Sequence, residues 1–207
     1  ASGEPRATDV ILDAALHLYG REGYAAVTIR ALARVIGCSP GALYTHFSDT
    51  DEIIRALQAR GLRLFAEAVM AVNAADPIEA LRRFFLAYYE FSKAQPDYFA
   101  LLWVDHIAPA IEPAQPDLRR VVAFGHGLAE RCLKKGAIPA GLTPVTITTV
   151  LWCSVHGAAV LRRMASGAPG PAGDLLAAST LEIALAGLQA GILSSVPLPT
   201  RRPAVRP

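Results

Sequence analysis

The sequence predicts an all-α protein with about nine helices, in which a small N-terminal helical domain precedes a larger one. Apolar residues recur at intervals of three and four along most of the 207 residues, as in amphipathic helices. No segment has a persuasive strand pattern, and the sequence shows no internal repeat. We expect domains at residues 1–49 and 50–196, followed by a disordered tail at 197–207 that is rich in proline and arginine.

The first two helices follow from their apolar spacing. A helix over about 8–22, ended by Gly23, would turn inward the residues Val10, Ile11, Ala14, Ala15, Leu18 and Tyr19. The second helix repeats the same period through Ile29, Leu32, Ala33 and Ile36. Thr28 precedes it as a plausible N-cap, and Gly37 supplies the permissive backbone that ends it.

A third, short helix follows at once. Ser39 is placed to cap it, and Pro40 falls in its first turn, where no N–H is missed. This helix would bury Leu43 and Phe47. Its other face carries small and polar residues, namely Ser39, Gly41, Ala42, Tyr44, Thr45 and His46. A helix, a short glycine-containing turn and a second short helix form the helix-turn-helix of DNA recognition.

The side-chain types favour DNA binding over the simpler alternative, which is a pair of packed helices in any helical protein. A helix that enters the major groove needs small residues where its backbone meets phosphate. It also needs hydrogen-bonding side chains where it meets base edges. Gly41 and Ala42 satisfy the first need, and the second is met by Ser39, Tyr44, Thr45 and His46.

Six longer or later helices complete the expected fold. Asp51 and Glu52 favour the N-terminus of the fourth helix electrostatically. Asp76 and Pro77 open the fifth, which is rich in aromatic residues. The expected ranges are about 50–72, 77–94, 97–108, 117–135, 144–166 and 174–193. A proline-containing loop at 109–116 and a Gly/Pro/Ala loop at 167–173 separate some of them.

Residues 8–57 resemble the N-terminal domain of the TetR family of transcriptional regulators. The matching features are ILDAALHLYGREGYAAVT, then IRALARVIGCSPGALYTHF, then the acidic start of the next helix. The stretch from Trp152 through His156 to Gly157 is similar to a Trp/His-Gly motif in one branch of TetR regulatory domains. The resemblance implies a cytoplasmic, ligand-responsive regulator, by family default a repressor, that binds a palindromic double-stranded DNA operator as a homodimer.

The same resemblance places the DNA contacts on Thr28, Arg30, Ser39, Pro40, Gly41, Ala42, Tyr44, His46 and Thr50. Tyr44 and Thr28 are the expected phosphate anchors. Arg30 and His46 are the expected base readers, since a guanidinium can bind guanine through two hydrogen bonds. Many family members carry Lys in place of Thr50, whose neutral hydroxyl implies a reduced affinity or salt dependence.

Aromatic and histidine side chains in the middle of the chain are candidates to line an apolar pocket. They are Phe85, Tyr88, Tyr89, Phe99, Trp103, His106, Phe124, His126, Trp152 and His156. For any single one of them, a place in the core is the simpler interpretation. As a group they predict a small, hydrophobic or aromatic effector, whose binding would change the distance between two DNA-binding heads.

The last two helices are candidates for the subunit interface. Apolar and small residues form a stripe on each, namely Val150, Cys153, Gly157, Val160, Leu161, Met164, Leu176, Ile183, Gly187 and Ala190. Such stripes let two helix pairs approach closely into a four-helix packing. An ordinary intramolecular core is the alternative. We favour the interface, because a single short recognition helix reads too few bases.

The charge of the N-terminal region argues against DNA binding. The net charge is only +2, and residues 1–55 carry seven acidic residues against five arginines. This leaves open a helical adaptor that no longer binds DNA. An enzyme would have to use Asp105 with His106, His126, or Cys153 beside His156. We expect no enzyme, because no glycine-rich phosphate loop or nucleophile elbow supports catalysis.

The remaining composition predicts a soluble protein without cofactors. The three cysteines, Cys38, Cys132 and Cys153, show no paired spacing and are expected to be free thiols, with no metal site. No apolar run reaches about 18 residues, so we expect no transmembrane helix. The N-terminus lacks the hydrophobic segment of a secretory signal. The mean hydropathy of +0.33 is therefore assigned to a ligand cavity or a subunit interface.

Overall fold

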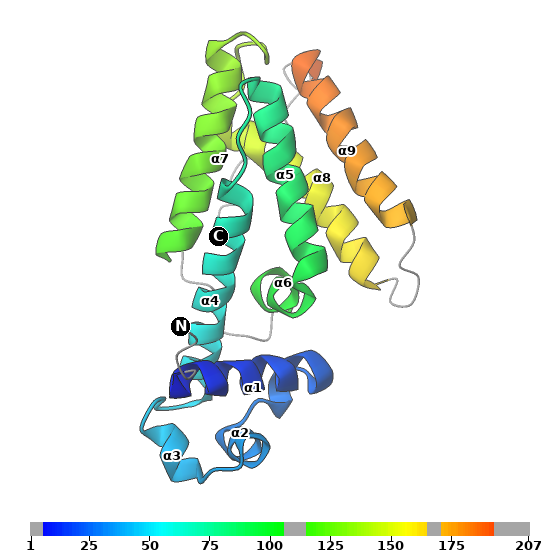
Figure 1. Ribbon diagram of the computed structural model, residues 1–207. Coiled ribbons are helices and arrows are strands. Elements are labelled where there is room, and N and C mark those ends of the chain that lie inside the picture. Colours follow the sequence, from blue (N-terminus) through cyan, green and yellow to red (C-terminus); the bar gives the residue numbers. More distant parts are fainter. Residues whose placement is uncertain (1–5, 106–114, 165–170, 193–207) are drawn as a thin grey trace, which may run out of the picture.

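The computed structural model describes residues 6–105, 115–164 and 171–192 (Figure 1). The helices are α1 (Ala7–Glu22), α2 (Ile29–Ile36), α3 (Pro40–Tyr44), α4 (Thr50–Met70), α5 (Pro77–Ala94), α6 (Pro96–Trp103), α7 (Pro116–Lys134), α8 (Pro144–Met164) and α9 (Pro171–Gln189), with a 3₁₀ turn, η1 (Tyr24–Ala26), after α1. Those ranges contain no strand. The prediction of an all-α protein with about nine helices is confirmed.

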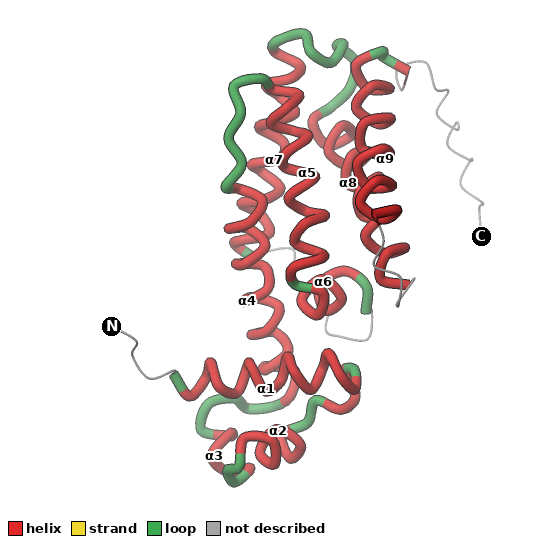
Figure 2. Tube along the Cα trace, turned by 45° about the vertical axis from the view of Figure 1, so that its right-hand side comes forward, coloured by secondary structure: helices red, strands yellow, loops and turns green. Residues whose placement is uncertain are grey.

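The helices form an elongated molecule with a small head at one end (Figure 1). The head consists of α1, α2 and α3, with α1 lying across the base of the larger bundle. The helix α4 starts in the head and runs up into the bundle, where it packs against α5, α6 and α7. Figure 2 shows α8 and α9 side by side on the far side of α5 from α4. The bundle is therefore connected to the head mainly through α4 and α6.

Capping side chains set the starts of the helices that position the head. The Thr28 hydroxyl accepts the Ala31 N–H at 3.2 Å at the start of α2, as the sequence predicts. Gly37 ends α2 in the left-handed conformation, with φ of 81°, which glycine adopts without a steric penalty. The Ser39 hydroxyl then accepts the Ala42 N–H at 3.3 Å at the start of α3. Two caps and one glycine therefore fix the turn between α2 and α3.

The head is filled by apolar side chains that belong to the same continuous core as those of the bundle. Side chains of all three helices, of the residue after η1 and of the segment before α4 contribute to it, namely Ile11, Leu12, Ala15, Leu18, Tyr19, Val27, Ile29, Leu32, Ala33, Leu43 and Phe47. Val10, which we expected to face inward, is 37% exposed. Adjacent residues on a helix are about 100° apart, so centring the buried face of α1 on Ile11 and Ala15 turns Val10 toward solvent.

Several helix ends differ from the predicted ones. The helix α4 ends at Met70 rather than 72, and α6 ends at Trp103 rather than 108. In α6 the N–H groups of Val104 and Asp105 both donate to the Ala100 carbonyl, which closes the last turn. The helix α9 begins at Pro171, within the predicted loop, because proline is well tolerated in a first helical turn. The predicted tail at 197–207 and most of the predicted loop at 109–116 lie outside the described residues.

One helix, α8, is long and apolar enough to cross a membrane by length and composition alone. It packs against α5, α7 and α9, and buries Ile147, Leu151 and Val155 in the bundle. The core helix of a soluble bundle has the same composition, so this helix is weak evidence for a membrane span.

Candidate functional site

The outer face of α2 and α3 gathers the residues predicted to contact DNA. These helices form the end of the head farthest from the bundle (Figure 1). Leu43 and Phe47 are buried beneath α3, as predicted. The solvent side exposes Thr28, Arg30, Ser39, Pro40, Gly41, Ala42, Tyr44 and His46. Tyr44 is 58% exposed, although an aromatic ring of that size usually finds cover in a monomeric domain.

The glycine in α3 has no internal reason to be a glycine. A Cβ atom added at Gly41 would meet only the Ser39 Oγ, at 3.7 Å, which is an ordinary contact. Its backbone is helical, so no left-handed conformation requires it. Glycine in a helix costs about 1 kcal/mol relative to alanine. The residue therefore keeps the backbone accessible on the outside of the molecule.

Two of the acidic residues near the head cap α4. Asp49 is the N-cap, and its carboxylate accepts the Glu52 N–H at 2.7 Å. Glu52 in turn accepts hydrogen bonds from the backbone N–H of Ser48 at 2.6 Å and from its hydroxyl at 2.8 Å. These bonds hold the pKa of Glu52 below its ordinary value. Both carboxylates are used in shaping the turn that leads out of α3.

Two further acidic residues are also paired within the protein. Asp13 of α1 forms an ion pair with Arg60 of α4 at 2.6 Å. Asp51 accepts a hydrogen bond from the Tyr24 hydroxyl at 2.9 Å, and burial followed by this bond raises the pKa of Tyr24. The acidic balance of the head thus reflects carboxylates that hold α1, η1 and α4 together.

The two arginines of α2, unlike these carboxylates, have no partner within the described part of the chain. Arg30 and Arg34 lie one turn apart on α2, and both are exposed. Neither forms an ion pair or a side-chain hydrogen bond with another residue in the described part of the chain. Thr50, the first residue of α4, is half-buried beside Asp49 and Asp51. The local charge on the α2 side is therefore more positive than the net charge of the head suggests.

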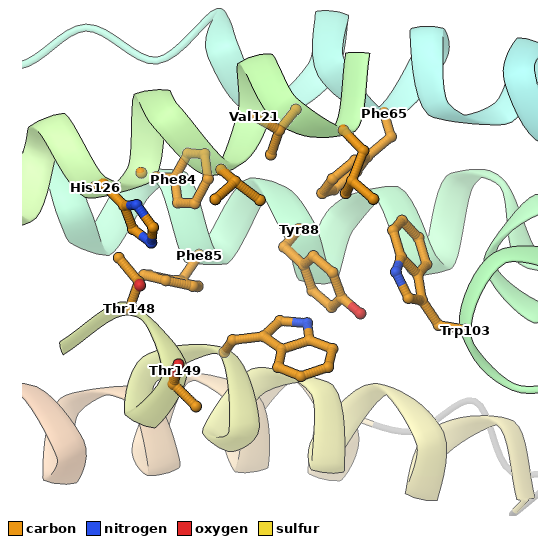
Figure 3. A pocket seen from close by; sticks show the side chains of 13 residues that line it. Phe65, Phe84, Phe85, Tyr88, Trp103, Val121, His126, Thr148 and Thr149 are labelled. Carbon is orange, nitrogen blue, oxygen red and sulfur yellow. The ribbon is translucent and has the colours of Figure 1, made fainter. Parts of the chain in front are cut away.

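A cavity of about 350 Å³ opens between α4, α5, α6, α7 and α8 (Figure 3). Its walls are mainly aromatic and aliphatic, with a few polar side chains, and consist of Phe65, Phe84, Phe85, Tyr88, Trp103, Leu118, Val121, Val122, Gly125, His126, Thr148, Thr149 and Trp152. That volume is at the lower end of the 300–1,000 Å³ typical of small-molecule sites. Both tryptophans of the protein line it.

Half of the predicted pocket residues lie on this wall. They are Phe85, Tyr88, Trp103, His126 and Trp152. Four others do not line the cavity, namely Tyr89, Phe99, Phe124 and His156. Tyr89 and Phe99 are almost fully buried, and Phe124 packs on Phe84 with ring centroids 5.8 Å apart. His106 lies outside the described residues.

His156 supports the wall from behind. Its Nδ1 lies 2.8 Å from the Tyr88 hydroxyl, and its ring packs on Phe99 and Trp152. Burial lowers the pKa of His156 and raises that of Tyr88. Both groups are therefore neutral near pH 7, and the Tyr88 hydroxyl can donate to the unprotonated ring nitrogen. Cys153 is exposed on α8, so His156 pairs with a tyrosine and not with a thiol.

The sequence interpretation missed eight wall residues, namely Phe65, Phe84, Leu118, Val121, Val122, Gly125, Thr148 and Thr149. Phe65 lay in the apolar stripe of the fourth helix and Phe84 among the aromatic residues of the fifth. Thr148 and Thr149 could not be predicted as wall residues from the sequence. A threonine in an apolar helix can be assigned to a cavity only when the helices packed around it are known. No group of three or more His, Cys, Asp and Glu is placed to share a metal ion within the described ranges.

The outward faces of α8 and α9 expose large apolar side chains. Of the predicted interface residues, Cys153, Leu161, Met164, Leu176, Ile183 and Ala190 are exposed. Val150, Gly157, Val160 and Gly187 are half-buried. Ile183 is 72% and Met164 is 74% exposed. Leu175 of α9 and Ile192, which follows α9, are further exposed apolar side chains.

Comparison with known families supports both parts of the chain. The family described as "Bacterial regulatory proteins, tetR family" matches residues 11–57, which hold most of the head and the start of α4. The family described as "Tetracyclin repressor-like, C-terminal domain" matches residues 81–184, about half of the chain.

Individual proteins are also similar to this chain in sequence or in structure. The HTH-type transcriptional repressor Rv1474c of Mycobacterium tuberculosis is 33% identical over 127 residues, which are 61% of this chain and 59% of that protein. A protein of unknown function from Rhodococcus sp. RHA1 superimposes with a TM-score of 0.75 at 22% identity, covering 91% of this chain and 98% of that one. The fatty acid degradation regulator FadR from Bacillus halodurans gives a TM-score of 0.72 at 16% identity, over 90% and 98% of the two chains.

The fold and the two matched domains define a transcriptional regulator with an N-terminal helix-turn-helix. The chain belongs to the TetR family of transcriptional regulators, and α2 and α3 form its DNA-binding helix-turn-helix. This is a family of transcriptional regulators.

Proposed function

We propose that the protein is a ligand-responsive repressor, which binds a palindromic operator as a homodimer and is released by a small hydrophobic or aromatic effector. Residues 1–49 would read DNA, and residues 50–196 would bind the effector and the second subunit. The observation that carries this proposal is the solvent face of α2 and α3. There the side chains of Arg30, Tyr44 and His46 form no hydrogen bond or ion pair with any residue in the described part of the chain, and nothing inside the protein requires a glycine at Gly41. That face is built for a partner with phosphates and base edges.

The contacts on DNA follow from the exposed groups. Tyr44 and Thr28 would anchor phosphates, and Arg30 and His46 would read base edges. Gly41 would let a phosphate approach the backbone of α3, since nothing in the protein fills the space where its side chain would be. Four of the seven carboxylates that make the head acidic are held in intramolecular bonds, which weakens the argument for an adaptor that has lost DNA binding.

The exposed apolar face of α8 and α9 supports a twofold dimer. Large side chains such as Ile183 and Met164 stand on it beside small residues, which lets two helix pairs pack closely. A dimer of this kind presents two recognition helices to half-sites about 34–36 Å apart.

The position of the cavity supports coupling to the head. Its wall includes Phe65 of α4, the helix that begins directly after the recognition motif. It also includes Trp103 at the end of α6, which packs against α1. A ligand that separates Phe65 from Trp103, whose ring centroids are 4.8 Å apart, would shift both helices. The two heads would then lose the spacing that the operator requires.

The proposal is tested by selecting DNA from a random duplex pool with the purified protein at two salt concentrations. We expect enrichment of a palindrome. Arg30→Ala and Tyr44→Ala should weaken binding to it, whereas Arg119→Ala, which removes an exposed arginine on α7, should not. If no sequence is enriched at either salt concentration, the protein is not a DNA-binding repressor and the adaptor becomes the better description.

A second variant separates DNA contact from folding. Gly41→Ala should leave stability unchanged or slightly raised, because alanine favours the helix and meets no close neighbour. It should nevertheless weaken operator binding. Gly127→Ala, in an exposed position of α7 with nothing within 4 Å, should leave operator binding unchanged. Equal affinity of the Gly41 variant and the wild type would remove this contact from the proposal.

A further inference from the structure

The cavity has two chemically different ends. Figure 3 shows His126 and Thr148 at one end, beside Phe84 and Phe85 and with Thr149 nearby on α8, while Phe65 and Trp103 stand at the other end, with Tyr88 between. The polar end is formed by α7 and α8, and the aromatic end by α4 and α6. Such a division selects a ligand with two matching parts.

The polar end has hydrogen-bonding capacity to spare. The Thr148 hydroxyl donates to the Pro144 carbonyl at 2.9 Å, which leaves its oxygen free to accept. The half-buried ring of His126 and the hydroxyl of Thr149 have no hydrogen bond with any residue in the described ranges. Together these groups can both donate to and accept from one small polar group.

The aromatic end of the cavity offers a ligand mainly the apolar faces and edges of aromatic rings. The Tyr88 hydroxyl is already paired with His156, so Tyr88 offers its ring to the cavity. Phe65 and Trp103 pack edge to face, and Tyr88 contacts both, with ring centroids 5.5 and 5.4 Å away. A flat apolar ligand would replace these contacts without leaving polar groups unpaired.

No Asp, Glu, Lys or Arg lies among the thirteen residues that the structure places on the wall. A carboxylate or an ammonium group would lose its hydration there without gaining an opposite charge. Interaction of a cation with aromatic faces offsets only part of that loss.

Building on the proposed effector site, we propose that the ligand is a neutral amphiphile: a flat, one- or two-ring body seated among Phe65, Tyr88 and Trp103, with one hydroxyl or carbonyl group bonded to His126 and the α8 threonines. The size follows from the cavity volume of about 350 Å³. The polar group follows from the unused capacity of His126 and Thr149.

The test is calorimetric titration of the full-length protein at pH 8 with four compounds of one ring system: 2-naphthol, naphthalene, 2-naphthoate and trimethyl(2-naphthyl)ammonium. We expect 2-naphthol to bind about tenfold more tightly than naphthalene, the size of effect that one hydrogen bond gives. The anion and the cation should bind about a hundredfold more weakly than 2-naphthol, or not at all. Both tryptophans line the cavity, so occupancy should also change the intrinsic fluorescence.

Substitutions locate the polar group. His126→Leu should abolish the preference for 2-naphthol over naphthalene while leaving naphthalene binding in place. Thr149→Val, a nearly isosteric change at an exposed position, should reduce the preference for 2-naphthol over naphthalene. This second variant keeps the test valid if the His126 variant does not fold. His17→Leu, the same exchange on the exposed side of α1, should change nothing. A charged compound that binds as well as 2-naphthol, an unchanged preference in both variants, or no binding of any compound would overturn the inference.

Operator release is measured separately. If 2-naphthol binds with the predicted selectivity but leaves operator affinity unchanged, the ligand class stands and the proposed release mechanism fails. If the charged compounds bind better and release the operator, the proposed function stands and the ligand class is wrong.

Discussion

The Tyr19 hydroxyl of α1 donates a hydrogen bond to the Asp105 carboxylate, two residues after the end of α6. Burial and then this bond raise the pKa of Tyr19. Trp103, which lines the cavity, lies only two residues before Asp105. We therefore expect a movement of Trp103 to reach the head through α6 as well as through α4.

Removing that hydrogen bond should uncouple the head from the cavity. In Tyr19→Phe we expect a stability loss of about 1–3 kcal/mol, since a carboxylate loses a partner in a partly buried place. Operator affinity without ligand should change little, but a ligand that fills the cavity should weaken operator binding less than in the wild type. Operator titrations with and without 2-naphthol measure the ratio of the two operator affinities in each protein.

Tyr24→Phe is the matched control, because it removes a tyrosine–aspartate hydrogen bond that joins η1 to α4 and does not reach α6. Its ligand response should equal that of the wild type. Equal responses in all three proteins would show that the Tyr19 bond is structural only.

The contact between α4 and α6 depends on a glycine. A Cβ atom at Gly61 would lie 2.7 Å from Tyr98 Cδ1 and 3.3 Å from Leu102 Cδ1. Tyr98 is buried, so its ring cannot simply turn away. Gly61→Ala should lower the free energy of unfolding by about 1–3 kcal/mol, although alanine is the better helix former. Urea unfolding at one fixed protein concentration measures it.

Gly127→Ala provides the comparison, because the same exchange on exposed α7 meets nothing within 4 Å. It should raise the free energy of unfolding by up to about 1 kcal/mol. A Gly61 variant as stable as the Gly127 variant would mean that α6 packs less tightly on α4 than the structure shows.

The half-buried histidine behind the cavity, His156, should make the protein sensitive to mild acid. Burial lowers the pKa of His156 in the folded state. Below about pH 6.5 the unfolded chain therefore binds more protons than the folded one. This contribution to stability is fully present above that pH and is lost as pH falls through the folded pKa. Protonation would also remove the nitrogen that accepts from Tyr88.

We expect the urea midpoint of the wild type to fall between pH 7.5 and pH 5.5. The fall should be smaller in His156→Asn, which keeps an acceptor but does not titrate. His17→Asn, on the exposed side of α1, should behave as the wild type does. Identical pH profiles for wild type and His156→Asn would assign the acid sensitivity to other groups.

The proposed subunit interface predicts a sharp response to a buried charge. Ile183→Asp would place two carboxylates in an apolar contact, so the dissociation constant of the dimer should rise about a hundredfold or more. Light scattering during size exclusion should show a monomer at concentrations where the wild type is a dimer. Val35→Asp, at an exposed apolar position of α2, should remain dimeric. A dimeric Ile183 variant would move the interface away from this face.

The fold could be predicted from the sequence where local chemistry decides it. Thr28, Gly37, Ser39 and Pro40 specify the ends of α2 and α3 within a few residues of chain, so their geometry follows from capping rules. The opening of α5 at Asp76 has the same origin, since its carboxylate accepts the Glu79 N–H at 2.7 Å.

The cavity wall could be predicted only in part, because it depends on how helices rotate against one another. Tyr88 and Tyr89 are adjacent aromatic residues of α5, yet the first lines the cavity and the second is buried elsewhere. Thr149 reads as an ordinary helix residue until α7 is placed opposite it. The periodicity of one helix fixes its own faces but not which neighbour each face meets.

The DNA contact of the head can be tested at Thr50, where many family members carry a lysine. Thr50 is the first residue of α4 and stands beside Asp49 and Asp51, where a neutral hydroxyl offers little to a phosphate. Thr50→Lys should tighten operator binding and make the slope of log affinity against log salt more negative by about 1.8, with about 0.9 from each subunit. Ala71→Lys adds the same charge at the exposed opposite end of α4 and should leave the slope unchanged. Operator titrations between 50 and 200 mM salt, in the range where such slopes are resolved, would distinguish the variants. An unchanged slope in Thr50→Lys would place the start of α4 away from the DNA backbone and restrict the DNA-binding surface to α2 and α3.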